Sequence, residues 1–293
     1  MGQQIVNGLF VGSIYALFAL GYTLVFGVLD ILNLAHAAVF MLASFVALAL
    51  VGTTHLHVLL ALPLAVAFAG VLGLVLERVA FRPLRGRSDS NISGLISSLA
   101  LATVFEAVAL ELWGPNVTRF PFGTIPEGRP ISFLGTGITR LQLTTLGVAL
   151  LLFAVLTWLV SASRLGREIR AVAESPRAAR ILGVDVDRVI AASFFISSAL
   201  GGAAGVLYGL AYNSISPDMG RSVELKGLAV IILGGMGSMT GAVIAGFALG
   251  LIEVFVVANV GASWRDTASF AALFVILVVR PRGLLGAAAL REA

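Results

Sequence analysis

Residues 225–258 read LKGLAVIILGGMGSMTGAVIAGFALGLIEVFVVA, an apolar stretch that a run of glycines interrupts near its middle. The part before the break is too short for an ordinary membrane span, which needs about 20 apolar residues. The part after it, Gly241–Ala258, is long enough to return as a full helix. We therefore expect a broken or re-entrant limb followed by a span, and irregular backbone at that depth must face protein or water.

The whole chain has the composition of a protein embedded in lipid. Of its 293 residues, 59% are apolar and 12% are charged, and the mean hydropathy is +1.02. Soluble domains are far more polar than this, so a soluble fold of this length has too little interior for so much apolar surface. The absence of cysteine excludes disulfides, thiolate metal sites and cysteine nucleophiles. We predict no catalytic residue, no metal site and no cofactor.

Charges and clusters of proline and glycine divide the chain into apolar runs of the length that crosses a membrane. The sequence predicts an all-α protein, a polytopic transmembrane helix bundle with about eight full spans plus the broken or re-entrant segment. We expect one domain over residues 1–293. The predicted spans are Ile5–Leu29, Leu34–Val51, Leu56–Leu76, Ile92–Trp113, Leu143–Val160, Val189–Tyr212, Gly241–Ala258 and Ala262–Val279.

Arginines gather in the loops at alternate ends of these spans. The loops Glu77–Asn91 and Ser163–Arg188 carry four and six arginines, and the C-terminal tail carries three. Because cytoplasmic loops are enriched in Lys and Arg, we predict that these segments and the C-terminus are cytoplasmic. The proline-rich loop 114–142 and the N-terminus are predicted to lie outside. This bias accounts for the sequence pI of about 10.1 without nucleic-acid binding.

Glycines repeat at four-residue spacing in several spans. Within a helix this spacing places them on one face, where two backbones can approach closely in lipid. Generic membrane packing explains any single pair, but the triple in the sixth predicted span favours a tightly packed bundle of the kind that transporters have. The repeats are Gly8/Gly12, Gly201/Gly205/Gly209, Gly237/Gly241 and Gly246/Gly250.

Residues 164–188 contain the signals of a short, well-bounded helix. Ser175 is a favoured N-cap, Pro176 fits the first helical position and Gly183 suits the position after the helix. A short rigid helix at the membrane face can receive force from a cytoplasmic ATPase, whereas a basic loop can also serve only to fix topology. Both interpretations stay open on local features alone. The predicted coupling residues are Glu174, Arg177, Arg180 and Gly183.

Polar groups inside predicted spans are expensive in lipid and usually face a bundle interior or a cavity. Each candidate also has a purely structural interpretation. These are pairing at a helix break for Asn33 and His36, an interhelical hydrogen bond for Glu106 or Glu253, and a simple turn for the glycine run. The candidates for lining or gating a pathway are Asn33, His36, Glu106, Gly234, Gly235, Gly237 and Ser238.

Other functional classes fit the sequence less well. An intramembrane serine protease is one such class. Ser238 does not belong to a GxSxG nucleophile elbow, because Met236 stands where the first glycine should be. The chain has no GxxxxGK[ST] phosphate loop, so we expect no ATP hydrolysis of its own. An ion-coupled secondary transporter with a broken helix remains an alternative, although it would gain little from the capped helix at Pro176.

Three segments together resemble the LIV-type branched-chain amino acid ABC permeases, and within them the H-type subunit. The first is residues 7–50, which contain LNLAH at 32–36. The others are residues 166–194 and residues 224–253, which contain LGGMGSMTGA at 233–242. After His36 the family usually continues with Gly and an acidic residue, whereas this chain has Ala37 and Ala38, so it lacks any contact that the acidic residue makes in relatives.

The resemblance implies a multi-pass permease subunit of the bacterial inner membrane. It would form the pathway for branched-chain or other small neutral amino acids by alternating access. The implied partners are a second permease subunit in a heterodimer, two cytoplasmic ATPase subunits and an extracytoplasmic substrate-binding protein. Some relatives take urea or short amides, and a urea or short-amide permease is therefore the alternative.

Overall fold

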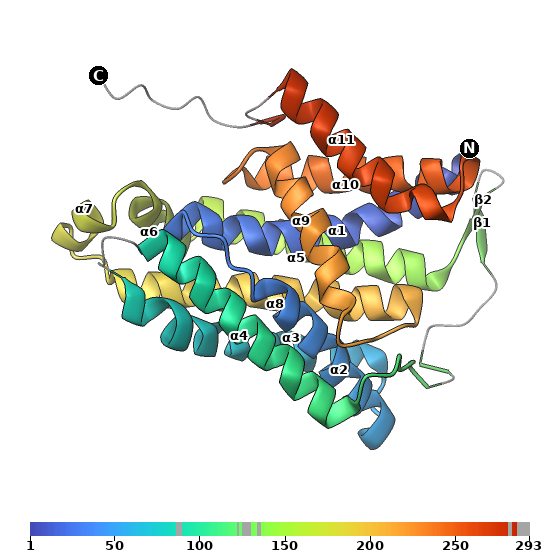
Figure 1. Cartoon of the computed structure of the whole chain (residues 1–293), viewed down its shortest axis with the longest axis horizontal. Coiled ribbons are helices and arrows are strands. Elements are labelled where there is room, and N and C mark those ends of the chain that lie inside the picture. Colours follow the sequence, from blue (N-terminus) through green and yellow to red (C-terminus); the bar gives the residue numbers. More distant parts are fainter. Residues whose placement is uncertain (86–89, 122, 125–129, 134–135, 281–282, 286–293) are drawn as a thin grey trace.

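The computed structural model describes the chain except for residues 86–89, 122, 125–129, 134–135, 281–282 and 286–293. The described part is a bundle of helices with one small β-hairpin (Figure 1). The main helices are α1 (Gly2–Leu29), α2 (His36–Thr54), α3 (Val58–Leu76), α4 (Ser90–Trp113), α5 (Arg140–Ala162), α6 (Arg164–Glu174), α7 (Pro176–Ile181), α8 (Val186–Tyr212), α9 (Met219–Gly234), α10 (Met239–Asn259) and α11 (Arg265–Val279). Shorter elements are η1 (Glu77–Phe81), η2 (Arg82–Leu84), η3 (Ala262–Trp264), β1 (Ile131–Phe133) and β2 (Thr136–Ile138).

Eight helices among the described residues are long and apolar enough to cross a membrane. They are α1, α2, α3 with its continuation to Leu84, α4, α5, α8, α10 and the segment Ala262–Val279. The short helix α9 is not one of them, because it has only 16 residues and carries three charged side chains. The prediction of an all-α polytopic bundle with about eight spans and one broken segment is confirmed.

The helices α1 and α8 form the centre of the bundle. Of the apolar windows of these two helices, 78% and 72% are buried, against 6% for the span that contains α11. A Cβ at Gly12 of α1 would lie 2.8 Å from the Cα of Phe247 in α10, and one at Gly246 would lie 2.7 Å from the Cα of Ala16. The predicted pairs Gly8/Gly12 and Gly246/Gly250 therefore meet in one close helix contact, as small residues allow in lipid.

The other glycine repeats divide into one prediction that holds and one that fails. Gly205 of α8 packs against the backbone carbonyl of Phe40 in α2, so the α8 glycines also permit close approach. The prediction of a helical Gly237/Gly241 pair is wrong. Gly237 has a φ of 84° and lies in the turn between α9 and α10, since a left-handed residue there ends the helical path.

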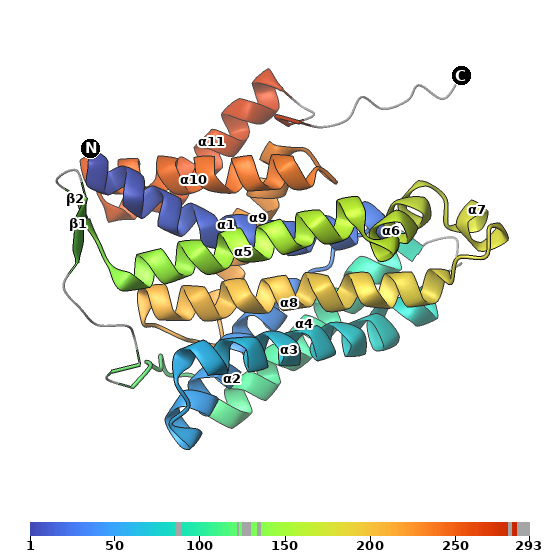
Figure 2. The same ribbon diagram turned by 180° about the vertical axis from the view of Figure 1, so that it is seen from behind.

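The arginine-rich segments η1, η2, α6 and α7 define one end of the bundle, which we call the basic end. In Figure 1, α6 and α7 lie at the left, while the N-terminus, β1 and β2 lie at the right. Figure 2 shows α5 and α8 running from one end to the other. We call the opposite end the hairpin end. The predicted cytoplasmic and external loops thus lie at opposite ends, as the orientation requires.

The hairpin end is joined by backbone and amide hydrogen bonds. The strands β1 and β2 pair antiparallel, and the Gln3 side chain bonds to both backbone groups of Gly137 at 3.1 Å. Thr118 and Ile215 exchange backbone hydrogen bonds of 2.8 and 2.9 Å, which ties the loop 114–142 to the segment before α9. This loop, predicted as one external segment, therefore holds the N-terminus and the entry into α9 together.

Candidate functional site

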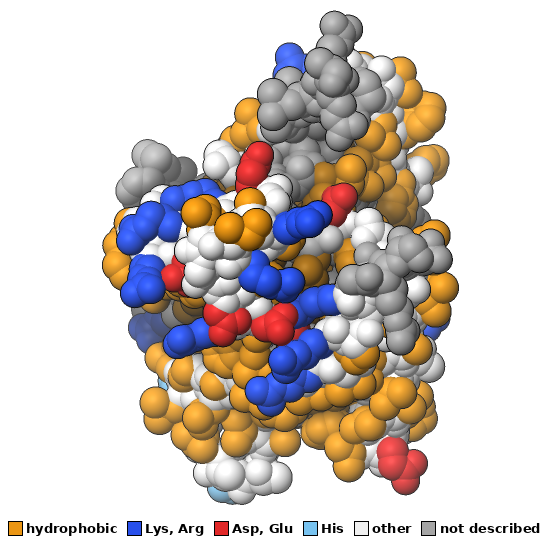
Figure 3. Space-filling view, turned by 90° about the vertical axis from the view of Figure 1, so that its left-hand side faces the viewer, with side chains coloured by type: hydrophobic (Ala, Val, Ile, Leu, Met, Phe, Trp, Pro, Cys, Tyr) orange, Lys and Arg blue, Asp and Glu red, His pale blue; other side chains and the backbone are white. Residues whose placement is uncertain are grey.

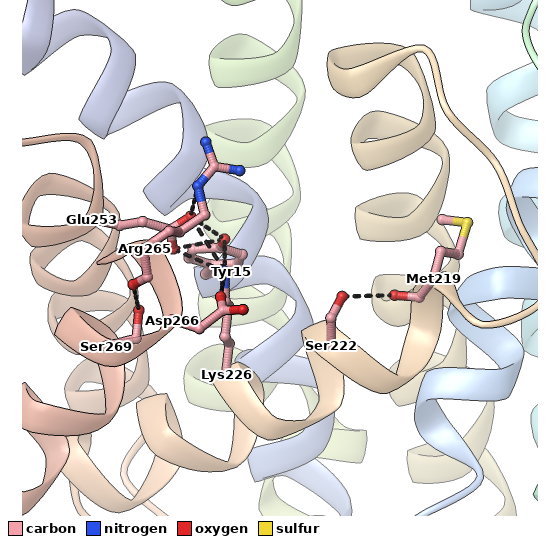
Figure 4. Close-up of polar contacts among 8 residues, drawn as sticks. All are labelled: Tyr15, Met219, Ser222, Lys226, Glu253, Arg265, Asp266 and Ser269. Atoms are coloured by element: carbon pink, nitrogen blue, oxygen red, sulfur yellow. Dashed lines mark hydrogen bonds and ion pairs between the residues drawn. The ribbon is translucent and has the colours of Figure 1, made fainter. Parts of the chain in front are cut away.

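A group of charged side chains, part buried and part exposed, lies where α1, α9, α10 and α11 meet (Figure 4). Its centre is Glu253 of α10, which is 1% exposed. The Nζ of Lys226 on α9 lies 3.2 Å from Glu253 Oε2 and 3.0 Å from Asp266 Oδ1. The Nε of Arg265 lies 3.0 Å from Glu253 Oε1. The Tyr15 hydroxyl donates to Glu253 Oε2 over 2.9 Å, and Lys226 Nζ donates to that hydroxyl over 3.2 Å. We call these five residues the charge cluster.

Small residues bring α9 close enough to complete the charge cluster. A Cβ at Gly220 would lie 2.5 Å from the carbonyl oxygen of Ala37 in α2, and Gly227 packs against the Phe18 ring of α1. Lys226 lies beside Gly227, so the close packing of α9 on α1 fixes the direction of its side chain toward Tyr15 and Glu253. A larger residue at either glycine would separate the helices.

The charge cluster is costly for a membrane bundle. Moving ions out of water costs several kcal/mol each, and a buried pair offsets this only with good geometry and further hydrogen bonds. The cluster balances two acids with two bases and adds a tyrosine hydroxyl. Apolar side chains would join the same helices at lower cost. An intramembrane group of this kind is by default a functional candidate.

A polar cavity of about 350 Å³ lies next to the charge cluster, toward the hairpin end. Tyr212 lines it, and the Tyr212 ring lies 5.8 Å from the guanidinium carbon of Arg265. Ser222, another lining residue, precedes Lys226 by one turn of α9 (Figure 4). Ligand pockets start at about 300 Å³, so the cavity has room for one amino acid.

The predicted candidates Asn33 and His36 lie at the break between α1 and α2. Asn33 Oδ1 accepts from the backbone N–H of Ala35 at 3.2 Å, and His36 Nε2 lies 3.3 Å from the carbonyl oxygen of Phe18. The imidazole fits a slot between Gly21 and Gly201, where a Cβ would lie 2.8 and 2.6 Å from its Cε1. This geometry supports their structural interpretation, pairing at a helix break.

These two side chains nevertheless keep unused hydrogen-bonding capacity. Asn33 Nδ2 and His36 Nδ1 are buried without a partner among the described residues. Ala37 and Ala38, the two residues after His36, are 4% and 3% exposed. They pack within the bundle, and Ala37 contacts α9 through Gly220. A role of the break in the pathway stays a prediction.

Glu106, predicted for a pathway or an interhelical hydrogen bond, forms an interhelical ion pair. Its Oε2 lies 3.5 Å from the Nη2 of Arg221 on α9. The Arg221 side chain is 75% exposed and that of Glu106 is 32% exposed. A charge that faces lipid hydrocarbon is expensive, so this α4–α9 face requires water or protein beside it.

The glycine run forms the turn that joins α9 to α10. Gly234 ends α9, Gly235 has a φ of 98°, and Ser238 caps α10 by accepting from the Gly241 N–H at 3.1 Å. The backbone N–H groups of Leu284 and Leu285 bond to the carbonyls of Leu233 and Gly234 at 2.7 and 3.1 Å. The structure therefore supports the turn interpretation and gives Ser238 a capping role. Pathway roles for Gly234, Gly235, Gly237 and Ser238 remain predictions.

The predicted short helix is present as α7. The Ser175 hydroxyl accepts from the Ala178 N–H at 3.2 Å, Pro176 is the first helical residue, and Gly183 has a φ of 84°. Preceding it, α6 is capped by Ser163 and ends at Glu174. The apolar tip residues Ile181 and Leu182 are each 80% exposed. At the other side, α8 begins with Asp185 as its N-cap.

The charge cluster was only partly visible in the sequence. Glu253 is recognisable as an ionisable residue inside a span, but Lys226 reads as a residue at a span edge. Arg265 and Asp266 stand near the start of the predicted span Ala262–Val279. The available signal was the coincidence of opposite charges at the ends of three consecutive apolar runs. Tyr15 gives no such signal, because it is an uncharged aromatic residue inside an apolar run.

Within the part of the chain that the structure describes, eight apolar spans, a short charged helix between two of them and a capped helix pair at the basic end define a polytopic membrane protein. Residues 4–279 match the family described as branched-chain amino acid transport system / permease component. The chain belongs to this family.

Individual proteins similar to this chain are also transport permeases. The chain is 35% identical over 296 residues to the high-affinity branched-chain amino acid transport system permease protein BraD of Pseudomonas aeruginosa, covering 97% of this chain and 95% of that protein. It is 36% identical over 295 residues to the corresponding permease protein LivH of Escherichia coli K12, with the same coverage. The autoinducer 2 import system permease protein LsrC of Klebsiella pneumoniae is 29% identical over 201 residues, 66% of this chain and 56% of that protein.

Proposed function

We propose that this chain is one membrane-spanning subunit of an ATP-driven importer for branched-chain or other small neutral amino acids. The observation that carries the proposal is the match to two high-affinity branched-chain amino acid permeases over 97% of the chain. A match of this extent includes all the spans, the short helix α9 and the capped helix α7. The proposed location is the bacterial inner membrane, with the basic end and the C-terminus in the cytoplasm.

The proposed complex contains a second permease subunit, two cytoplasmic ATPase subunits and an extracytoplasmic substrate-binding protein. The segment 164–188 is the proposed coupling segment, and α7 its point of contact with the ATPase. Two features support this assignment. Caps at Ser175 and Gly183 fix the helix, and its tip exposes Ile181 and Leu182 beyond the span ends. Exposed apolar side chains at such a position suit a protein partner.

The proposed moving element of the pathway is α9. It is short, it begins at Met219 after the segment that follows α8, it ends at the glycine turn, and it carries charges on two sides. Lys226 belongs to the charge cluster, whereas Arg221 pairs with Glu106 of α4. Broken helices with polar contacts are a common basis of alternating access. The second permease subunit or the water-filled pathway would cover the α4–α9 face.

The cavity of about 350 Å³ beside Tyr212 is the proposed first stop for a substrate released at the hairpin end. Its hydroxyl groups can bond to an amino acid, and Asp218 can attract the ammonium group. Apart from the charge cluster the spans offer few charged groups. A strongly charged solute would therefore pay a desolvation cost of several kcal/mol, which favours a neutral or zwitterionic one.

Competition uptake assays test the substrate. Cells that express the full complex are given labelled leucine in the presence of excess isoleucine, urea or acetamide. The proposal predicts that isoleucine suppresses leucine uptake and that urea and acetamide do not. Urea uptake that excess leucine leaves unchanged would instead support the urea or short-amide alternative.

A further inference from the structure

A second cavity, of about 570 Å³, lies at the basic end. It is enclosed by α7, η2 and the ends of α1, α4 and α8. The apolar side chains of Leu29, Ile31, Phe81 and Ile190 line its interior. Arg177 and Arg180 of α7 stand at its polar side. The cavity is therefore amphipathic, with an apolar interior and a cationic rim.

The two α7 arginines differ from the third arginine that lines this cavity. Arg85 is already paired with Glu77 and, at 2.8 Å, with Asp187. Neither Arg177 nor Arg180 forms an ion pair or a side-chain hydrogen bond in the part of the chain that the structure describes. Figure 3 shows basic side chains gathered at this end of the molecule, with apolar side chains around them.

The position of the cavity determines how deep in the membrane its ligand would lie. Leu29 is the last residue of α1, and Ile190 lies in the second turn of α8, so the lining residues come from span ends. Span ends lie at the level where lipid headgroups meet the hydrocarbon. The basic end is the one that positive charge assigns to the cytoplasmic leaflet, whose anionic lipids attract Lys and Arg.

We propose that this cavity binds one anionic phospholipid. Its phosphate pairs with Arg177 and Arg180, which as guanidinium groups bind phosphate through paired N–H donors. One acyl chain begins in the apolar interior over Ile31, Phe81 and Ile190. The bound lipid connects α7 to the ends of α1 and α8. This assignment does not rest on the proposed transport function.

Lipid retention measured on the full chain tests this proposal. The purified protein is reconstituted with phosphatidylglycerol or phosphatidylcholine of identical acyl chains, stripped with detergent and analysed by native mass spectrometry. We expect one retained phosphatidylglycerol and at least tenfold less retained phosphatidylcholine. The double variant R177Q/R180Q should lose the preference. The control R164Q/R167Q removes the same charge from α6, outside the cavity, and should keep it.

Further variants and a competition experiment distinguish lipid binding in the cavity from general attraction of anions to the arginines. Ile190→Trp, or Ile31→Trp where the first variant fails to fold, fills the interior and should also abolish retention. Loss of the lipid in these variants supports the cavity, because neither changes a charge. Equal retention by wild type and R177Q/R180Q would overturn the proposal. Displacement of the lipid by millimolar inorganic phosphate would also overturn it, since it would show a site for a free anion.

Discussion

Glu253 and Lys226 form a buried ion pair across two helices, with Lys226 Nζ 3.2 Å from Glu253 Oε2. Glu253 also accepts from Tyr15 and pairs with Arg265, while Lys226 also reaches Asp266. The two residues are thus unequal members of the charge cluster. Glu253 has three partners and is almost fully buried, whereas the second acid, Asp266, is 64% exposed.

This asymmetry predicts which of two substitutions lowers the stability of the fold more. Glu253→Leu leaves two cations without their shared buried partner and should lower the free energy of unfolding by about 3–5 kcal/mol. Lys226→Met should cost less, because Glu253 keeps Arg265 and Tyr15. Thermal unfolding followed by tryptophan fluorescence measures both, as the chain has three tryptophans.

The matched control for this pair is Glu168→Gln. Glu168 pairs at 3.0 Å with Arg164, whose side chain is 88% exposed. Such a surface pair contributes about 0–1 kcal/mol, so the control should scarcely change the unfolding temperature. Equal shifts for Glu253→Leu and Glu168→Gln would show that the charge cluster does not hold the helices together.

The contact of α1 with α10 predicts a strong dependence on glycine. Gly12→Leu inserts a side chain where a Cβ would already lie 2.8 Å from the backbone of Phe247. Overpacking of this kind costs about 1–3 kcal/mol, and more where backbone must shift. Gly147→Leu on α5 is the control, because no atom lies within 4 Å of its added Cβ. Similar unfolding temperatures for the two variants would contradict the close contact.

The sequence predicts the local features of this fold well. The spans follow from run length, and the cap of α7 follows from Ser175, Pro176 and Gly183, because helix ends are determined within a few residues. The charge cluster lies beyond such reasoning. Tyr15 and Glu253 are 238 positions apart, and only the packing of α1 on α10 brings them together.

The difference between local signals and long-range packing also applies to the other polar candidates. Polarity inside an apolar run identifies Asn33, His36 and Glu106, but it cannot choose their partners. His36 fills a slot between glycines of two other helices, and Glu106 pairs with an arginine of α9. For Gly237, four-residue spacing suggested a helix face, whereas the actual positive φ depends on the turn around it.

The exposed tip of α7 predicts the contact with the ATPase. Leu182→Asp should weaken co-purification of the ATPase at least tenfold, which is about 1.4 kcal/mol and within the value of one buried leucine. Its unfolding temperature should not change, because Leu182 is 80% exposed. Ser132→Asp, at the hairpin end, is the control. Unchanged ATPase recovery with Leu182→Asp would place the docking surface elsewhere.

The opposite ends of the bundle predict opposite accessibility. A single cysteine replacing Arg164 at the basic end should react only with reagents that enter the cytoplasm, and one replacing Ser132 should react from outside. The chain has no native cysteine, so the labelling has no background. Labelling of the Arg164 position by an impermeant external reagent would reverse the orientation.

Transport by the reconstituted complex tests the central claim most directly. Proteoliposomes that contain this chain, its second permease subunit and its ATPases are given labelled leucine and the binding protein on the external side. The account predicts leucine accumulation that requires ATP at the cytoplasmic face and persists when ion gradients are collapsed. Accumulation without ATP that an imposed ion gradient drives would contradict it and support an ion-coupled secondary transporter.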